Sequence, residues 1–152
     1  MRQQGVTLLE LVICIGVFGI IASTAIPKLG QSLARQELDG ASQQLAADIR
    51  WLQQVSINLG SGTTSYIMKL NCSEPYGYDV TNQTQVIKKV TFPSSVMLSS
   101  SSSIIFGLSG APLIGQTVML KSIKLNTKKY VILAPVTGRV RISDFAPWQA
   151  EE

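Results

Sequence analysis

The sequence predicts an α+β protein in which one long helix, residues 6–58, is packed on a small antiparallel β-sheet domain. Three observations lead to this fold class. Residues 6–26 form an apolar run with a single charge, residues 33–55 repeat apolar side chains mostly every three or four positions, and beyond residue 62 the repeat shortens to two. Periods near 3.6 and 2 are those of a helix and of a strand that each bury one face. The helix therefore precedes the strands.

The apolar run from Val6 to Ile26 is long enough to span a membrane. Its 21 residues cover about 31 Å at helical rise, close to the hydrocarbon thickness of a bilayer. Its one charge is Glu10. A carboxylate at membrane depth costs on the order of 2.5–3.5 kcal/mol, so Glu10 requires a partner. By the positive-inside tendency, Arg2 stays cytoplasmic, which puts everything after Pro27 on the other side of the membrane.

Two simpler interpretations of this run remain open, a cleaved secretory signal peptide and an uncleaved anchor. Ser23, Thr24 and Ala25 supply a small-residue cleavage site of the signal-peptide kind. Glu10 within the apolar core and Pro27 close behind that site are untypical of a signal peptide. The charge therefore favours an interpretation that gives Glu10 a partner.

The stretch from Gly5 to Val12, GVTLLELV, resembles the cleavage and methylation signal of type IV pilins and type II secretion pseudopilins. The resemblance implies that a prepilin peptidase cuts after Gly5 on the cytoplasmic side and methylates the new amine of Val6. Glu10 stands at the most specific position of that signal, and Pro27 stands where the family has its helix-kinking proline. Val6 departs from the usual Phe or Met.

The same resemblance divides the chain into a leader peptide (1–5), a transmembrane and filament-core helix (6–26), and an amphipathic helix with a β-rich globular pilin domain (27–152). It implies assembly with other pilin subunits on a platform in the cytoplasmic membrane, where the Glu10 carboxylate meets the Val6 amine of a neighbour. A buried charge that is paired in this way need not be expensive. The globular domain would lie outside the cytoplasm, and the protein would later enter a pilus or pseudopilus.

The second half of the helix carries one apolar stripe, with polar side chains elsewhere. The stripe consists of Leu33, Leu38, Ala41, Leu45, Ile49, Leu52 and Val55. A single stripe of this kind predicts packing against a sheet. The residues Gly60, Ser61 and Gly62 predict the end of the helix.

Alternation of apolar and polar residues predicts eight strands after the helix, separated by turn residues. They are expected at residues 64–70, 76–80, 85–91, 96–98, 103–107, 117–125, 129–135 and 139–142. The clearest hairpin joins residues 118–125 to 130–133 through Asn126, Thr127 and Lys128. The serine run at 99–103 predicts a loop that leads into a strand.

The segment from Val136 to Ile142, VTGRVRI, resembles part of the sheet domain of minor pseudopilins and fimbrial minor pilins of the GspH/FimT type. Alternation puts Arg139 and Arg141 on one strand face, and Lys128 and Lys129 precede them in a stretch without acidic residues. Two interpretations remain open, a solvated outer face of the sheet and a patch that binds DNA phosphates. In some minor pilins of this type, a similar Gly-Arg-x-Arg element is associated with DNA binding.

Catalytic and metal-binding chemistry has no support in the sequence. The count of histidine is 0 in 152 residues, which removes His-dependent triads and metal sites, and no phosphate-binding loop or nucleophile elbow occurs. Cys14 lies inside the apolar run and Cys72 outside it, so no disulfide is expected. We therefore predict no enzyme activity, catalytic residue, metal or cofactor. The predicted function is that of a minor pilin or pseudopilin, or alternatively of a DNA-binding minor pilin for DNA uptake.

Overall fold

The computed structural model describes residues 7–59, 66–100 and 102–147. The predictions for Gly5, for Val6 and for the helix end at residues 60–62 lie outside the described residues, as does the side chain of Pro27. The chain divides into two compact units, residues 1–33 and residues 34–152. Each unit is described by itself below.

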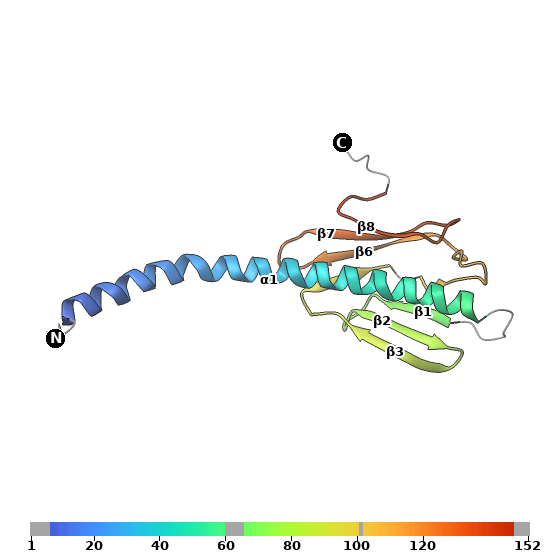
Figure 1. The fold of residues 1–152 in the computed structure, drawn as a ribbon, viewed down its shortest axis with the longest axis horizontal. Helices are drawn as coiled ribbons and strands as arrows, with labels where there is room; N and C mark the ends of the chain where they lie inside the picture. Colours follow the sequence, from blue (N-terminus) through green and yellow to red (C-terminus); the bar gives the residue numbers. More distant parts are fainter. Residues whose placement is uncertain (1–6, 60–65, 101, 148–152) are drawn as a thin grey trace, which may run out of the picture. The chain divides into compact units, whose positions relative to one another are not determined.

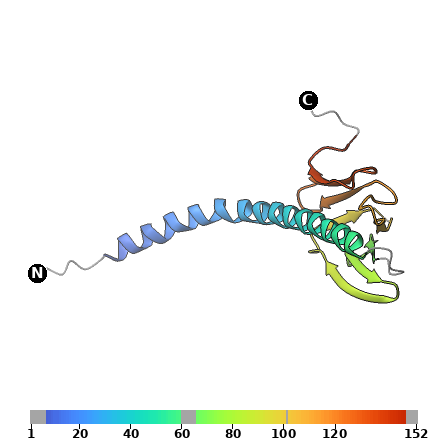
Figure 2. The ribbon, with the colours of Figure 1, turned by 45° about the vertical axis from the view of Figure 1, so that its right-hand side comes forward.

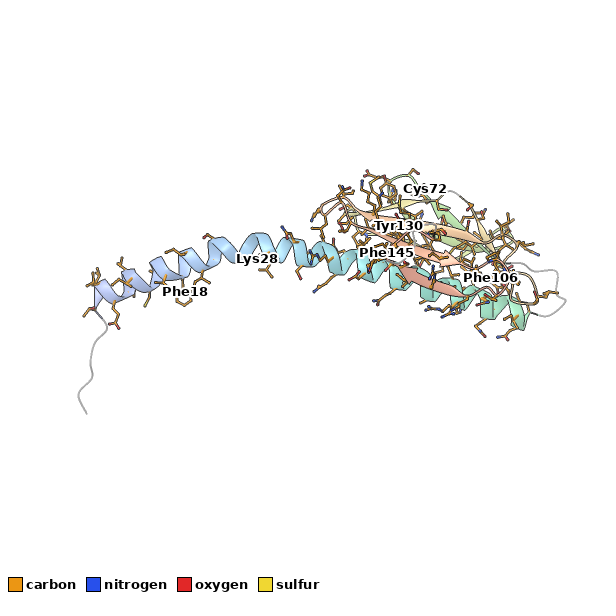
Figure 3. All side chains as sticks on the ribbon, turned by 90° about the horizontal axis from the view of Figure 1, so that it is seen from above. Phe18, Lys28, Cys72, Phe106, Tyr130 and Phe145 are labelled. Carbon is orange, nitrogen blue, oxygen red and sulfur yellow. The ribbon has the colours of Figure 1, made fainter. Side chains whose placement is uncertain are left out.

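Helix α1, Leu8–Asn58, begins at a side-chain cap. The Thr7 hydroxyl accepts a hydrogen bond from the backbone N–H of Glu10 at 3.3 Å, which satisfies one of the free N–H groups of the first turn. In the first unit the described apolar side chains of α1 are exposed, for example Phe18 (Figure 3), which is 72% exposed. By length and composition this helix can cross a membrane. The predicted long helix is confirmed, although it begins at Leu8 and not at residue 6.

The described residues of the second unit form eight antiparallel strands in two four-stranded sheets (Figure 1). Sheet A has the strand order β3-β2-β1-β5, and sheet B has the order β4-β6-β7-β8. The strands are β1 (Tyr66–Asn71), β2 (Gly77–Asn82), β3 (Gln85–Thr91), β4 (Val96–Ser99), β5 (Ile104–Ile105), β6 (Gln116–Ser122), β7 (Lys128–Leu133) and β8 (Val140–Ser143). The α+β class is therefore confirmed, with two sheets in place of one.

The core of this unit lies between α1 and the two sheets, which flank the C-terminal half of the helix on two sides (Figures 1 and 2). The helix contributes most of the predicted stripe to this core, namely Leu38, Ala41, Leu45, Ile49 and Leu52. Leu33, expected in the same stripe, is instead 52% exposed. Leu33 lies before the helical part of the core cluster, which begins at Leu38.

The strands occur near the expected positions, but several of them are shorter than expected. β5 contains only two residues, and β6 ends at Ser122 and not at residue 125. The hairpin of β6 and β7 is confirmed, but its turn starts earlier. The Ser122 N–H donates to the Thr127 carbonyl at 2.9 Å, and the Asn126 N–H donates to the Ser122 carbonyl at 3.0 Å. Asn126 has a positive φ of 55°, which asparagine adopts more readily than most residues.

Candidate functional site

The first candidate site is the start of α1, where a carboxylate lies among exposed apolar side chains. Glu10 is exposed, as are its neighbours Leu9 and Leu11. Because Glu10 is in the first turn, its negative charge is favourable at the positive end of the helix dipole. Among the described residues, no ion pair involves Glu10. In an apolar environment this carboxylate would therefore need a cation from outside the described residues.

The second candidate site is the outer side of sheet B, which faces away from α1. Arg139 directly precedes β8 and Arg141 lies within it; both are exposed, whereas Val140 between them is buried. The predicted alternation is therefore confirmed. The two arginines line a hollow of about 280 Å³ together with Ile132 and Ala134. The hollow combines two guanidinium groups with apolar side chains, which suits an anionic ligand that is partly apolar or has an extended backbone.

The turn that precedes β8 is held by the helix. Gly138 has a positive φ of 64°, and a side-chain carbon there would lie 2.4 Å from both the Gln53 amide nitrogen and the Gly110 carbonyl oxygen. Gln53 donates a hydrogen bond to that carbonyl at 2.7 Å, and Arg50 donates one to the Val140 carbonyl at 3.1 Å. Glycine is the residue that adopts a positive φ most readily. The sequence pattern does not reveal the helix contacts, because their partners are 57 and 90 residues apart.

The two lysines predicted in the same patch do not line this hollow. Lys129 points toward α1, and its ammonium group lies 3.0 Å from the carboxylate of Asp39 in that helix. The same ammonium group lies 2.9 Å from the carboxylate of Asp144, which directly follows β8. The hydrogen bond to Asp144 raises the pKa of Lys129. The charge of Lys129 is therefore compensated within the domain. Lys128 is exposed, at the opposite end of β7 from Ile132.

A buried polar cluster joins α1 to sheet A, and the sequence pattern does not reveal it. Asp48 of α1 is 8% exposed; it accepts hydrogen bonds from the Tyr78 hydroxyl and, at 2.6 Å, from the Lys88 ammonium group. Burial and the adjacent carboxylate both raise the pKa of Tyr78. The one available signal is the helical position of Asp48 beside Leu45 and Leu52 of the apolar stripe. A buried, hydrogen-bonded cluster of this kind is structural.

Both cysteines are free. Cys14 is exposed on α1, and the thiol of Cys72 donates to the Ser100 carbonyl at 2.7 Å. In the part of the chain that the structure describes, no group of three or more His, Cys, Asp or Glu side chains could hold a metal ion.

Residues 1–26 match the family described as the prokaryotic N-terminal methylation motif. The matched region contains Gly5, Val6 and Glu10. No curated protein and no solved structure matches the chain. The motif supports a type IV pilin-like precursor that a prepilin peptidase processes and that assembles with other pilins. Pilins are a structural, non-enzymatic family, and the apolar part of α1 is consistent with a single-pass membrane protein.

Proposed function

We propose that this protein is a minor pilin or pseudopilin, a structural subunit of a type IV pilus or of a type II secretion pseudopilus. The match of residues 1–26 to the methylation motif carries this proposal. It is supported by an exposed apolar helix whose first turn contains Glu10, a carboxylate without an ion-pair partner among the described residues. The α+β architecture with two small sheets supports a domain of the kind that such helices display.

In the proposed mechanism, the precursor resides in the cytoplasmic membrane with its N-terminus in the cytoplasm and its β domain outside. Prepilin peptidase removes residues 1–5 by cleavage after Gly5 and methylates the amine of Val6. The assembly platform in the membrane then transfers the subunit into the filament. There the Glu10 carboxylate pairs with the Val6 amine of a neighbour, because a charge moved into an apolar filament core is strongly destabilising unless it is paired. Pro27 marks a kink at the end of the membrane segment.

Mass spectrometry of the mature protein tests the processing step. We expect a chain that begins at a methylated Val6, and an intact Met1 would contradict the proposal.

Sheared filaments, analysed by immunoblot, test the assembly step. Glu10→Ala should still insert in the membrane but should be lost from filaments, whereas Glu74→Gln in the exposed turn before β2 should assemble normally. Normal incorporation of Glu10→Ala would exclude the pairing role.

The second candidate function is DNA binding for DNA uptake, and the exposed arginine pair favours it. Arg139 and Arg141 are two residues apart along a nearly extended chain, about 6.6 Å, and the charges of one DNA strand follow each other every 3.4 Å along the axis. Two guanidinium groups on long side chains can therefore contact separate phosphates of the same strand. Lys128, which forms no ion pair with the described residues, can add a distant contact, whereas Lys129 is engaged with Asp39 and Asp144.

DNA binding by the full chain in detergent, measured over a range of salt concentrations, tests this second function. Arg139→Gln with Arg141→Gln should lower the affinity at every sequence and reduce the salt slope by roughly 0.9 per lost phosphate contact. The matched control is Lys69→Gln with Lys89→Gln, two exposed lysines of sheet A. An absence of binding at low salt would remove DNA uptake and leave the filament role untouched.

A further inference from the structure

The end of the β6–β7 hairpin carries three lysines that form no ion pair with the described residues. Lys121 of β6 and Lys128 of β7 are register partners, and Lys124 lies in the turn between them. The Lys121 side chain points away from the core, because Leu120 and Ser122 on either side of it are fully buried. Like charges directly opposite each other destabilise a sheet, so an anionic partner would stabilise this end of the hairpin.

A fourth cation, Arg35 of α1, lies at the same end of the second unit. Arg35 from the helix and Lys128 from the hairpin line one hollow of about 410 Å³. The two carboxylates in its lining, those of Asp39 and Asp144, both bind the ammonium group of Lys129. Arg35 and Lys128 therefore border this hollow without an ion-pair partner among the described residues.

An exposed apolar side chain stands among these cations. Ile123 directly follows β6, lies between Lys121 and Lys124 in the chain, and is 50% exposed. Its backbone N–H donates to the Ser95 carbonyl at 2.8 Å, which fixes the start of the turn. Cations around an apolar side chain suit the surface of an anionic membrane, where the apolar group enters the headgroup boundary. A DNA backbone would pair with the lysines but would leave Ile123 in water.

This basic end is also the part of the second unit at which the chain enters it. The apolar run ends at residue 26, and residues 27–34 of α1 separate it from Arg35. Eight helical residues cover about 12 Å, of which the headgroup layer occupies about 5–7 Å. When the apolar run lies in a bilayer, Arg35 therefore stays close enough to the headgroups for their charge to act on it.

We propose that a basic end, defined by Arg35, Lys121, Ile123, Lys124 and Lys128, binds the anionic headgroups of the membrane in which the apolar part of α1 resides. The four cations contact headgroup phosphates, and Ile123 enters the boundary between headgroups and acyl chains. The proposal rests on the membrane residence that is part of the proposed function. It does not rest on processing or on assembly into a filament.

Hydrogen exchange of the full chain in lipid nanodiscs tests this contact. One disc contains only phosphatidylcholine, and the other contains an equal mixture of phosphatidylcholine and phosphatidylglycerol. We expect the backbone amides of residues 123–128 to exchange more slowly in the mixed discs than in the phosphatidylcholine discs. Added salt should reverse the slowing, because it screens exposed charges. Equal exchange of these amides in the two discs at low salt would overturn the proposal.

A matched pair of charge variants tests whether this surface makes the contact. Lys124→Gln with Lys128→Gln should lower the ratio of bound to unbound domain by roughly fivefold for each lysine, and the slowing should fall accordingly. Lys69→Gln with Lys89→Gln removes the same charge from exposed positions of sheet A and should leave the slowing unchanged. Equal losses in both variants would show that only the total charge matters, which would overturn the proposal.

Ile123→Ser tests the apolar part of the contact. It should reduce the slowing although all four cations remain, while the amides of β2 exchange as in the parent chain and so report an intact fold. An unchanged slowing would overturn the insertion of Ile123 into the membrane.

Two other occupants would be recognised by the same amides. Slowing by DNA in phosphatidylcholine discs, with none in the mixed discs, would assign the lysines to nucleic acid. Slowing that appears only with several chains in a disc would assign this end to a second copy. Either result would overturn the proposal and leave the filament role untouched, whereas a chain that does not enter discs would contradict the membrane residence itself.

Discussion

At the scale of single residues, the carboxylate of Asp48 joins α1 to sheet A. It is buried, and its hydrogen bonds come from the Tyr78 hydroxyl and the Lys88 ammonium group. A buried carboxylate is strongly destabilising when it loses a donor. The cluster therefore ties the rotation of the helix about its axis to the position of one particular pair of strands, β2 and β3.

We expect Tyr78→Phe to lower the free energy of unfolding by about 1.5–3 kcal/mol, because Asp48 loses a hydrogen bond to its charge. Urea denaturation of the full chain in detergent measures this loss. Tyr76→Phe is the matched control: Tyr76 is a partly buried tyrosine directly before β2, and its change should have a small effect. Equal losses in the two variants would show that the Asp48 contact does not stabilise the fold.

The raised pKa of Tyr78 predicts that the stability of the fold depends on pH. The pKa of Tyr78 is raised in the folded protein above its ordinary value of 10.0, so the folded state holds its proton more tightly than the unfolded state does. The contribution of Tyr78 to stability is therefore fully present below about pH 10 and decreases as the pH rises further, once the unfolded tyrosine ionises. Denaturation curves between neutral pH and pH 11 should show a steeper fall for the parent chain than for Tyr78→Phe.

At the scale of elements, the turn between β7 and β8 is fixed by contacts with the helix and with a second turn. Gly138 lies against the Gly110 carbonyl, and Gln53 of α1 binds that same carbonyl. Arg50 holds the backbone of β8 one residue after Arg139. Arg139, directly before β8, and Arg141, within it, are consequently presented by backbone that the helix holds in place.

Gly138→Ala should destabilise the domain by about 1–3 kcal/mol from the positive φ alone. A further loss is expected because the new carbon would lie 2.4 Å from a backbone oxygen, which cannot rotate away. Thermal unfolding measures the sum. Gly107→Ala is the control, since a carbon there has its nearest neighbour at 3.6 Å and φ is not positive. If both alanine variants unfold at the parent temperature, the close approach at Gly138 is unimportant.

At the scale of the whole molecule, the two units have different requirements. The described apolar side chains of residues 7–33 are exposed and need a membrane or other subunits around them. The core of the second unit is complete in itself, because each of its members lies at Leu38 or beyond. The helix therefore has two different parts: its second half packs in the core of the domain, and the described apolar side chains of its first half remain exposed.

A chain that begins at Leu29 should for that reason be soluble and should unfold cooperatively, with the same denaturation midpoint as the β domain of the full chain. Circular dichroism should show the loss of helical signal from residues 8–28 and an unchanged contribution from the strands. A fragment that is unfolded, or that requires detergent, would mean that the first unit contributes to the core.

Much of this organisation follows from neighbouring residues. The long helix, the approximate strands and the β6–β7 hairpin follow from apolar period and turn residues, which act over a few positions. The methylation signal around Glu10 is also a contiguous stretch, so it too can be recognised from the sequence alone.

Other features required the folded chain. Sequence periodicity does not show that β4 leaves sheet A for sheet B while β5 returns to β1, since strand pairing depends on residues far apart. For the same reason it cannot show that Lys129 faces Asp39 and Asp144, while Lys128 beside it faces away from the core toward Lys121. The basic stretch that appears as one patch in the sequence is divided by the pleat of β7 into an internal ion pair and an outer surface.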